Sequence, residues 1–310
     1  MKNSKRFLLL IFILVFQYAP QADAQETRML RGKVIDAETG EAVPYAAAEI
    51  ISKHLGAAAN AEGLLQFEIS ESMMGETVTF SALAYYSRQL SVKELVEKQP
   101  FKVELERRTY SLPEFTIVGN SKGKVQLGNF IQDYHKTAML TTAGMIAAVF
   151  MDNSDACDGT IKSISYYIVK RNRRVKSHSR TPFRVRVFAV DSLTGEPGED
   201  LLTEELVVRA NGPGWFTVDV SKYNIKVPNR GYFAAMEWVY SKKKYYYQAS
   251  GLDPQRYYGQ QLGIIVGDFT QNSWKKYLAY EWEFLNEENP PIIKGKFTNV
   301  LINSEIECFK

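Results

Sequence analysis

The sequence predicts an all-β protein built from two β-sandwich units, and three observations support this. Short runs of alternating apolar and polar residues fill residues 29–106 and again residues 160–240. Clusters of Gly, Pro, Asn and Asp separate the runs, as turns separate the strands of a sandwich. The length of 310 residues suits about two domains that each bury a core.

The first 24 residues have the pattern of a secretory signal peptide. A basic start is followed by ten apolar residues, 7–16, and by the small-residue pattern Ala22-Asp23-Ala24. An uncleaved anchor is the alternative, but spanning a bilayer takes about 20 apolar residues. We therefore expect cleavage before Gln25 and no transmembrane segment afterwards. The mature chain is expected in the periplasm or on the outer-membrane surface.

Charge and cysteine content limit the functional classes. The net charge of the whole chain is +3, which gives no reason to expect binding to nucleic acid. The two cysteines, Cys157 and Cys308, could pair in an oxidising compartment or remain two small buried residues. Neither has a histidine in a recognisable catalytic signature.

Residues 25–106 are expected to form the first sandwich. Leu30, Gly32 and Val34 alternate with polar neighbours, and residues 36–40 predict a tight turn in which Gly40 supplies positive φ. Further strands are expected around residues 46–51, 64–69, 78–82 and 101–105. Seven short strands would fit two packed sheets.

The same region resembles the carboxypeptidase-like regulatory domain, a transthyretin-like sandwich common in exported proteins of Bacteroidetes-type bacteria. The opening motif of that family is matched by Gly32, Val34, Asp36, Thr39, Gly40, Val43, Pro44 and Ala46. A second motif is matched by Gly56, Gly63 and Phe67, although Asn60 replaces an Asp and Ala57 replaces a Thr. The resemblance implies a seven-stranded fold without catalytic residues. No zinc-peptidase ligand motif follows it.

Residues 107–124 are expected to form a linker. Residues 112–119 resemble the segment that joins such domains to TonB-dependent receptors, but the roughly 190 residues that follow are too few for a receptor barrel. We expect an edge strand or an extended connection there. Residues 119–123 fit the G-x-S-x-G pattern of a serine nucleophile, yet no helical pattern follows, so a hydrolase elbow is not expected.

Residues 125–286 are expected to form the second sandwich, followed by a C-terminal extension, 287–310. Alternation predicts strands at residues 164–168, 183–187 and 216–220, and the apolar run 231–240 predicts a strand buried on both faces. One short helix is expected within residues 137–150. The order of the motifs at 196–202, 214–220 and 227–238 resembles the jelly-roll sandwiches of exported bacterial proteins, which include carbohydrate-binding modules.

Glu237 is the sharpest single candidate for a site. It lies in an apolar run, where a buried charge needs a partner, and Arg184 or Arg186 could supply it. The residue is either half of a structural ion pair or an acid in a pocket. Glycosidase chemistry uses two carboxylates, and no second acid stands out.

Aromatic residues in the last third form the other candidate site. Tyr245, Tyr246, Tyr247 and Trp274 are predicted as ligand-binding rings, because a planar ring with a polar tip can stack on a sugar. Since alternate strand residues point to opposite faces, at least part of the tyrosine run is expected in the core.

Two charged loops carry weaker signals. The basic loop 170–176 could bind an anionic polymer or form a solvated hairpin tip. The acidic turn at Asp152 to Asp155, with Asp158, could hold Ca²⁺ but lacks EF-hand spacing, and no metal or other cofactor is predicted.

We therefore expect a non-enzymatic, exported binding or scaffolding protein of the bacterial envelope. A cell-surface glycan or another envelope protein is the expected partner, with glycan binding assigned to the second unit. The alternative is a hydrolase that processes polysaccharide or peptide.

Overall fold

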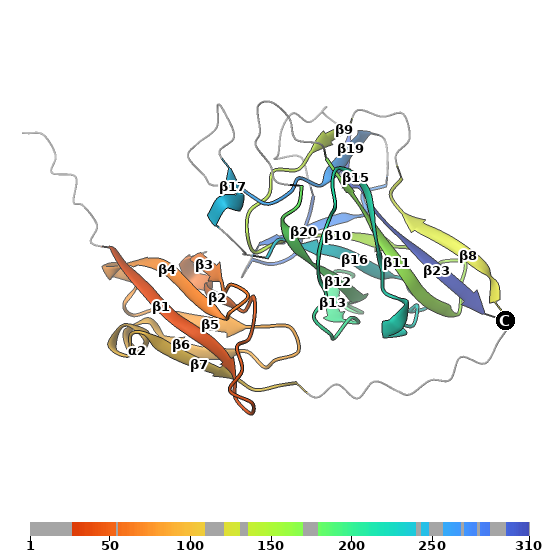
Figure 1. Cartoon of the computed structure of the whole chain (residues 1–310). Helices are drawn as coiled ribbons and strands as arrows, with labels where there is room; N and C mark the ends of the chain where they lie inside the picture. Colours follow the sequence, from red (N-terminus) through yellow and green to blue (C-terminus); the bar gives the residue numbers. More distant parts are fainter. Residues whose placement is uncertain are drawn as a thin grey trace, which may run out of the picture.

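The computed structural model describes residues 27–53, 55–108, 121–130, 136–169, 179–239, 243–247, 257–267, 270–277, 280–285 and 296–309. Strands dominate these residues, and helix is confined to a short α-helix and a few 3-10 turns, which confirms the all-β class. The described chain falls into an N-terminal unit, residues 27–108, and a C-terminal unit, residues 121–309 (Figure 1).

The N-terminal unit contains two sheets, with strand orders β4-β1-β7 and β3-β2-β5-β6. Its strands are β1 (Thr27–Asp36), β2 (Ala47–Ile50), β3 (Leu55–Ala58), β4 (Leu64–Ser70), β5 (Thr77–Ser81), β6 (Arg88–Ser91) and β7 (Phe101–Leu105). The sequence did not predict α2 (Val92–Glu97), whose first turn is capped by the Ser91 hydroxyl, which accepts the Glu94 N–H at 3.1 Å.

Alternation along these strands gives the N-terminal unit its core. Leu30, Val34, Ala48, Phe80 and Val103 are each fully buried between the two sheets. The turn that enters β4 depends on Gly63, which has a φ of +72°, and a Cβ there would lie 2.6 Å from the carbonyl oxygen of Val34. The predicted turn at Gly40 also has positive φ.

The C-terminal unit is built on two larger sheets. One has the order β13-β12-β16-β10-β20-β21, with β14 also paired to β12, and the other has the order β15-β11-β23-β8. Their strands are β8 (Ser121–Gly128), β10 (Met145–Met151), β11 (Gly159–Ile168), β12 (Pro182–Val190), β13 (Pro197–Asp200), β14 (Val207–Arg209), β15 (Gly214–Asp219), β16 (Tyr232–Glu237), β20 (Ser273–Tyr277), β21 (Glu283–Phe284) and β23 (Ile302–Phe309). Smaller sheets pair β9 (Lys136–Ala138), β19 (Gly263–Gly267) and β22 (Phe297–Val300), and β17 (Tyr246–Tyr247) with β18 (Tyr257–Tyr258).

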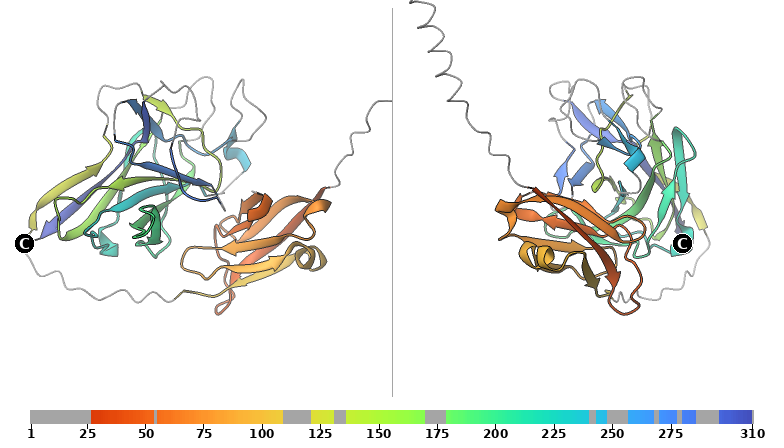
Figure 2. Two further views of the ribbon diagram at one scale, coloured as in Figure 1. Left: turned by 180° about the vertical axis from the view of Figure 1, so that it is seen from behind. Right: turned by 60° about the vertical axis from the view of Figure 1, so that its left-hand side comes forward.

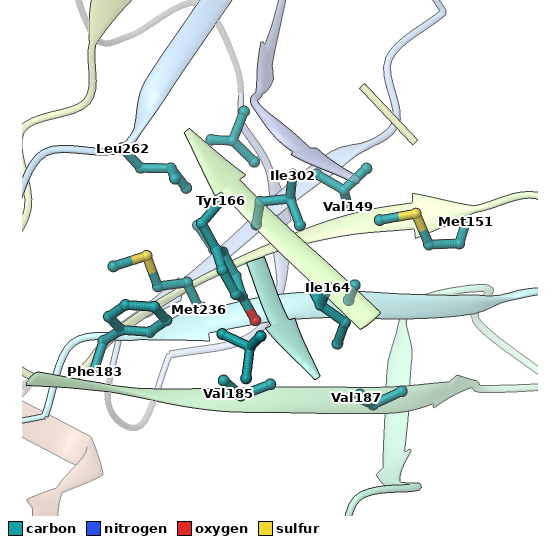
Figure 3. Packing of buried hydrophobic residues seen from close by; sticks show 14 of the residues in the cluster. Val149, Met151, Ile164, Tyr166, Phe183, Val185, Val187, Met236, Leu262 and Ile302 are labelled. Carbon is teal, nitrogen blue, oxygen red and sulfur yellow. The ribbon is translucent and has the colours of Figure 1, made fainter. Parts of the chain in front are cut away.

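The core of the C-terminal unit lies between these two large sheets. Tyr166 of β11 is fully buried and packs edge-to-face on Phe183 of β12, with ring centroids 5.0 Å apart (Figure 3). Its hydroxyl donates to the carbonyl of Ala235 at 3.0 Å, which satisfies its polar tip inside the core. The predicted strands at 164–168 and 183–187 are confirmed.

Three predictions about the C-terminal unit and its boundaries are wrong. A helix was expected within residues 137–150, but residues 145–151 form β10 between β16 and β20, because pairing on both edges overrides local helix propensity. The expected extension 287–310 instead supplies β22 and β23, and β23 lies between β11 and β8 (Figures 1 and 2). The expected linker likewise ends early, since β8 begins at Ser121.

A disulfide joins Cys157 to Cys308, with Cα atoms 5.4 Å apart. It ties the loop before β11 to β23, where Cys308 is the register partner of Gly159. Within the described residues, no helix combines the length and apolar character that a membrane span requires.

Candidate functional site

The outer face of the seven-stranded sheet, the face turned away from the core, carries two different rows of side chains. Strand register places Arg184, Glu237, Ile146 and Lys276 side by side in one row across β12, β16, β10 and β20. Two rows further along, Phe188, Phe233 and Phe150 are aligned in the same way. The face therefore changes from charged to aromatic within one sheet.

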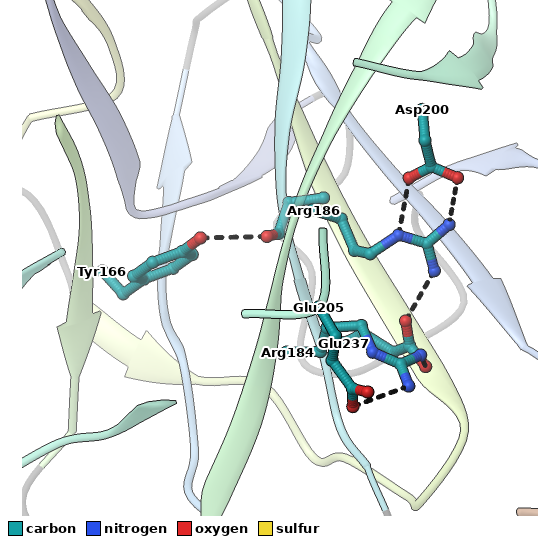
Figure 4. Close-up of polar contacts among 7 residues, drawn as sticks. Tyr166, Arg184, Arg186, Asp200, Glu205 and Glu237 are labelled. Carbon is teal, nitrogen blue, oxygen red and sulfur yellow. Dashed lines mark hydrogen bonds and ion pairs between the residues drawn. The ribbon is translucent and has the colours of Figure 1, made fainter. Parts of the chain in front are cut away.

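Glu237 lies at the centre of a buried ion network (Figure 4). One carboxylate oxygen accepts from Arg184 Nη1 at 2.7 Å and the other from Arg186 Nη1 at 2.6 Å. Arg186 also makes a bidentate pair with Asp200, at 2.7 and 2.6 Å, and Arg184 reaches Glu205 at 3.5 Å. Both predicted partners of Glu237 are thereby confirmed.

The electrostatics of this network follow from burial and pairing. Burial alone would raise the pKa of the Glu237 carboxyl, but the guanidinium groups of Arg184 and Arg186 outweigh it and hold that pKa below its ordinary value. Burial raises the pKa of Glu205, which has only the longer contact to Arg184. The Nε atom of Arg184 is buried without a hydrogen-bond partner among the described residues.

The aromatic end of the same face forms a second apolar layer outside the core. We call this layer the aromatic face, and its rings are Phe150, Phe188, Phe233, Trp274, Trp282 and Phe284. Within this face Phe188 and Phe233 are buried, Trp274 and Trp282 are partly buried, and Phe284 is 39% exposed. Trp274 and Phe284 lie with centroids 4.0 Å apart, and Trp282 packs edge-to-face on Phe188 at 5.6 Å.

A cleft of about 330 Å³ lies where the N-terminal unit approaches the charged row. From the N-terminal unit it is lined by Tyr45, Tyr85 and Arg108 and by the outer face of β2 and its neighbours. On that face Glu49 lies among the small side chains of Ala47, Ala58 and Ser81. From the C-terminal unit it is lined by the ion network and by Lys276 and Trp282.

Glu49 is the charged group of the N-terminal unit that this cleft buries. Glu49 is 9% exposed, and its carboxyl makes no hydrogen bond or ion pair with any residue that the structure describes. Burial raises its pKa to about 7, against the attraction of Lys276, and the nearby Glu237 carboxylate raises it further. At neutral pH the group is therefore poised between the acid and the carboxylate.

Backbone geometry at the cleft is also unusual. Tyr45 and Ala84 both line the cleft and both have positive φ, 56° and 64°. Residues other than glycine rarely adopt this conformation, and such strain concentrates at functional positions.

The four residues of the predicted aromatic site do not lie together in the structure. Tyr245 is buried in the core and packs edge-to-face on Tyr258, so its predicted role as an exposed ligand-binding ring is wrong. Tyr246 and Tyr247 form β17, but their side chains lie outside the described part. Trp274 lies on the aromatic face.

Several functional candidates were missed from the sequence. Glu49 follows Ala46, Ala47 and Ala48, so the rule that singled out Glu237, a charge inside an apolar run, applies to it equally. Lys276 and Trp282 carry no comparable local signal, because only strand pairing across the sheet brings them to the cleft.

The remaining predicted features do not belong to the cleft or to the aromatic face. The signal peptide, the segment 112–119 and the basic loop 170–176 fall outside the described residues. In the acidic turn, Asn153 donates to the carbonyls of Cys157 and Pro228, and Asp152 accepts the Ser154 N–H. Among the described residues, no group of three or more His, Cys, Asp or Glu side chains is placed to hold a metal.

A larger groove, of about 1420 Å³, follows the outer face of β1 and β4. Its charged side chains, Arg31, Lys33 and Lys102, are all exposed to solvent. It lacks the buried, unpartnered groups that distinguish the smaller cleft.

Comparison with known proteins adds little. No protein-family model matches the chain, and no curated protein matches it. A structure of the infectious bursal disease virus Gt strain aligns with 92% of this chain and 60% of its own, at 9% identity and a TM-score of 0.23. A structure of the Gx strain of the same virus aligns with 91% of this chain and 60% of its own, at 11% identity and a TM-score of 0.22. This chain thus spans about 60% of those viral chains, and similarity at this level carries no argument about its fold or its activity.

Proposed function

We propose that this is a non-enzymatic, exported binding protein of the bacterial envelope, whose C-terminal unit binds glycan. In this proposal the N-terminal unit is a carboxypeptidase-like regulatory sandwich of transthyretin type, and the C-terminal unit is a jelly-roll-like sandwich. Two sheets of three and four strands support the first assignment, and two large facing sheets support the second.

The aromatic face is the observation that carries the proposal. A sheet needs one apolar face to form its core, and this sheet has a second one on its outer side. Contiguous exposed apolar patches mark binding sites, and the exposed edge of this face is formed by Trp274, Trp282 and Phe284. Trp274, Trp282 and Phe284 offer planar rings, and the charged row beside them offers hydrogen-bonding groups, which together suit the apolar faces and hydroxyl edges of sugars.

Export is supported by two independent features. The first 24 residues have the signal-peptide pattern, and Cys157 and Cys308 are joined by a disulfide, a bond that persists mainly in oxidising compartments. We place the protein in the periplasm or on the outer-membrane surface.

A glycan-array screen of the chain from Gln25 to Lys310, followed by calorimetric titration of the hits, tests the proposal. Trp274→Ala and Trp282→Ala should each weaken binding at least about tenfold, as expected for central aromatic contacts. Trp215→Ala is the matched control, because Trp215 is 39% exposed on β15 of the other large sheet and should leave the affinity unchanged. The absence of any saturable glycan binding would refute the proposal and favour another envelope protein as the partner.

A hydrolase is the second candidate, and one observation favours it. Glu49 and Glu237 line the same cleft with opposite pKa shifts, as the acid and the carboxylate of a glycosidase do. Against it, both oxygens of Glu237 are already bound by arginines, so neither is available to attack a substrate or activate water. Incubation with polysaccharides should release no reducing ends. Release that disappears in both Glu49→Gln and Glu237→Gln would instead establish the hydrolase.

A further inference from the structure

We propose that Glu49 of the N-terminal unit and Lys276 of the C-terminal unit form one saccharide subsite, in which the hydroxyl groups of a single sugar bridge the two units. This inference rests on the proposed glycan binding and adds to it a contact from the unit that carries no aromatic face. Binding would then depend on both units together.

Glu49 is the buried acidic group that the N-terminal unit contributes to the cleft. Glu49 is 9% exposed as a residue, it lines the cleft, and the described residues supply neither a hydrogen bond nor an ion pair to its carboxyl. A largely desolvated carboxylate without a protein partner is stabilised by a hydrogen bond, which a ligand hydroxyl can donate. The small side chains of Ala47, Ala58 and Ser81 leave the surrounding wall of the cleft open to such a ligand.

Lys276 supplies the complementary group from the opposite wall. Its ammonium nitrogen lies 6.0 Å from the ring centroid of Trp282 and forms no ion pair with a carboxylate in the described part of the chain. It is close enough to Glu49 to oppose the effect of burial on that carboxyl, yet no ion pair joins the two groups in the described part of the chain. The gap between them is the space that we assign to the sugar.

The charge balance of the cleft favours a neutral, hydroxyl-rich ligand over a strongly ionic one. Arg184 and Arg186 are engaged by Glu237, Asp200 and Glu205. The remaining groups are the Glu49 carboxyl, the Lys276 ammonium and the Trp282 indole, with the Arg108 guanidinium exposed and packed on the Tyr86 ring. A sugar hydroxyl can donate to the carboxylate while another accepts from the ammonium, and the apolar face of the ring can stack on Trp282. A volume of about 330 Å³ is at the small end of the range for ligand pockets, about 300–1000 Å³.

Titration of the full chain with the best array saccharide tests the subsite. Glu49→Ala and Lys276→Met should each weaken binding about 10- to 100-fold, the range for hydrogen bonds to charged groups. Glu68→Ala and Lys93→Met, which change exposed residues of β4 and α2, are the matched controls and should leave affinity unchanged. Thermal unfolding of every variant checks that the chain is folded.

Deoxy analogues of the same saccharide give a second measurement, in which two ligands are compared on the same chain. Removing the hydroxyl that contacts Glu49 should weaken binding to the wild-type chain, but should weaken binding to Glu49→Ala no further. If Trp274→Ala abolishes binding while Glu49→Ala and Lys276→Met bind within twofold of wild type, the subsite is refuted and the proposed function stands. If no saccharide binds at all, both are refuted.

Discussion

The ring centroid of Tyr45 lies 5.6 Å from the guanidinium carbon of Arg184, although the two residues belong to different units. Arg184 is 3% exposed and holds Glu237 on its other side, so this contact connects the N-terminal unit directly to the ion network. Burial at this contact also raises the pKa of the Tyr45 hydroxyl.

Tyr45→Ala should loosen the contact between the units. A cation–π contact contributes about 0.5–2 kcal/mol, which is large relative to a small interface. Small-angle X-ray scattering should therefore show a larger radius of gyration for Tyr45→Ala. Tyr86→Ala removes a ring that lies 5.3 Å from Arg108 of its own unit, and it should leave the radius as in the wild type. Equal radii for all three chains would exclude Tyr45 as a connection between the units.

Glu237→Gln should destabilise the C-terminal unit by about 3–5 kcal/mol, because it leaves two buried guanidinium groups without their shared carboxylate. Urea unfolding monitored by tryptophan fluorescence measures the change. The comparison variant is Glu283→Gln, which removes an exposed partner of Lys275 and should cost less than about 1 kcal/mol. Similar losses for both variants would mean that burial does not strengthen the network.

Glu49 should make stability depend on pH in an unusual direction. Its pKa is about 7 in the folded chain against an ordinary value of 4.5, so the folded state binds a proton that the unfolded state releases. The free energy of unfolding should consequently fall as pH rises from about 4.5 to about 7. The charged groups that act on the Glu49 carboxyl, and so affect how large this fall is, are Lys276 and Glu237. Glu49→Gln should remove this dependence. Identical pH profiles for the two chains in urea unfolding would contradict the assignment.

Asp36 should have the opposite effect. Its buried carboxylate accepts the N–H groups of Thr39 and Glu38, the Tyr85 hydroxyl at 2.9 Å and Arg107 Nε at 2.5 Å, and these contacts hold its pKa below the ordinary value of 3.8. Asp36→Asn should cost the N-terminal unit about 1–3 kcal/mol at neutral pH. The cost should shrink as pH falls below 3.8, where the unfolded chain is protonated. A cost that stays constant from pH 7 to pH 3 would rule out ionisation as its source.

Replacing Cys157 and Cys308 together by alanine should lower the unfolding free energy by about 2–5 kcal/mol. The disulfide spans 151 residues and fixes β23 beside β11, so the C-terminal unit should be the part that loses stability. Calorimetry with and without a reducing agent measures the change, and the reducing agent should affect the wild-type chain alone.

The alternation of apolar and polar residues was enough to predict strands with one apolar face, such as Phe183–Val187. A charge inside an apolar run was enough to predict that Glu237 needs an arginine partner. These local patterns failed where the environment is set by distant pairing. The strand at Met145–Met151 consists of apolar residues with small alanines, a pattern that also fits a helix, and only its neighbours β16 and β20 decide the outcome. The cleft was beyond prediction for the same reason, because Glu49 and Lys276 are more than 200 residues apart in the sequence.

The position of β23 also has a consequence for the order of folding. Ile302–Phe309 lies between β8, which opens the C-terminal unit, and β11, so the first strand of that sheet has no described partner other than the last one. A chain threaded through a secretion channel from its N-terminus would deliver residue 309 about 180 residues after β8. Until then the four-stranded sheet would stay incomplete, so the export that we propose would end before this unit could finish folding.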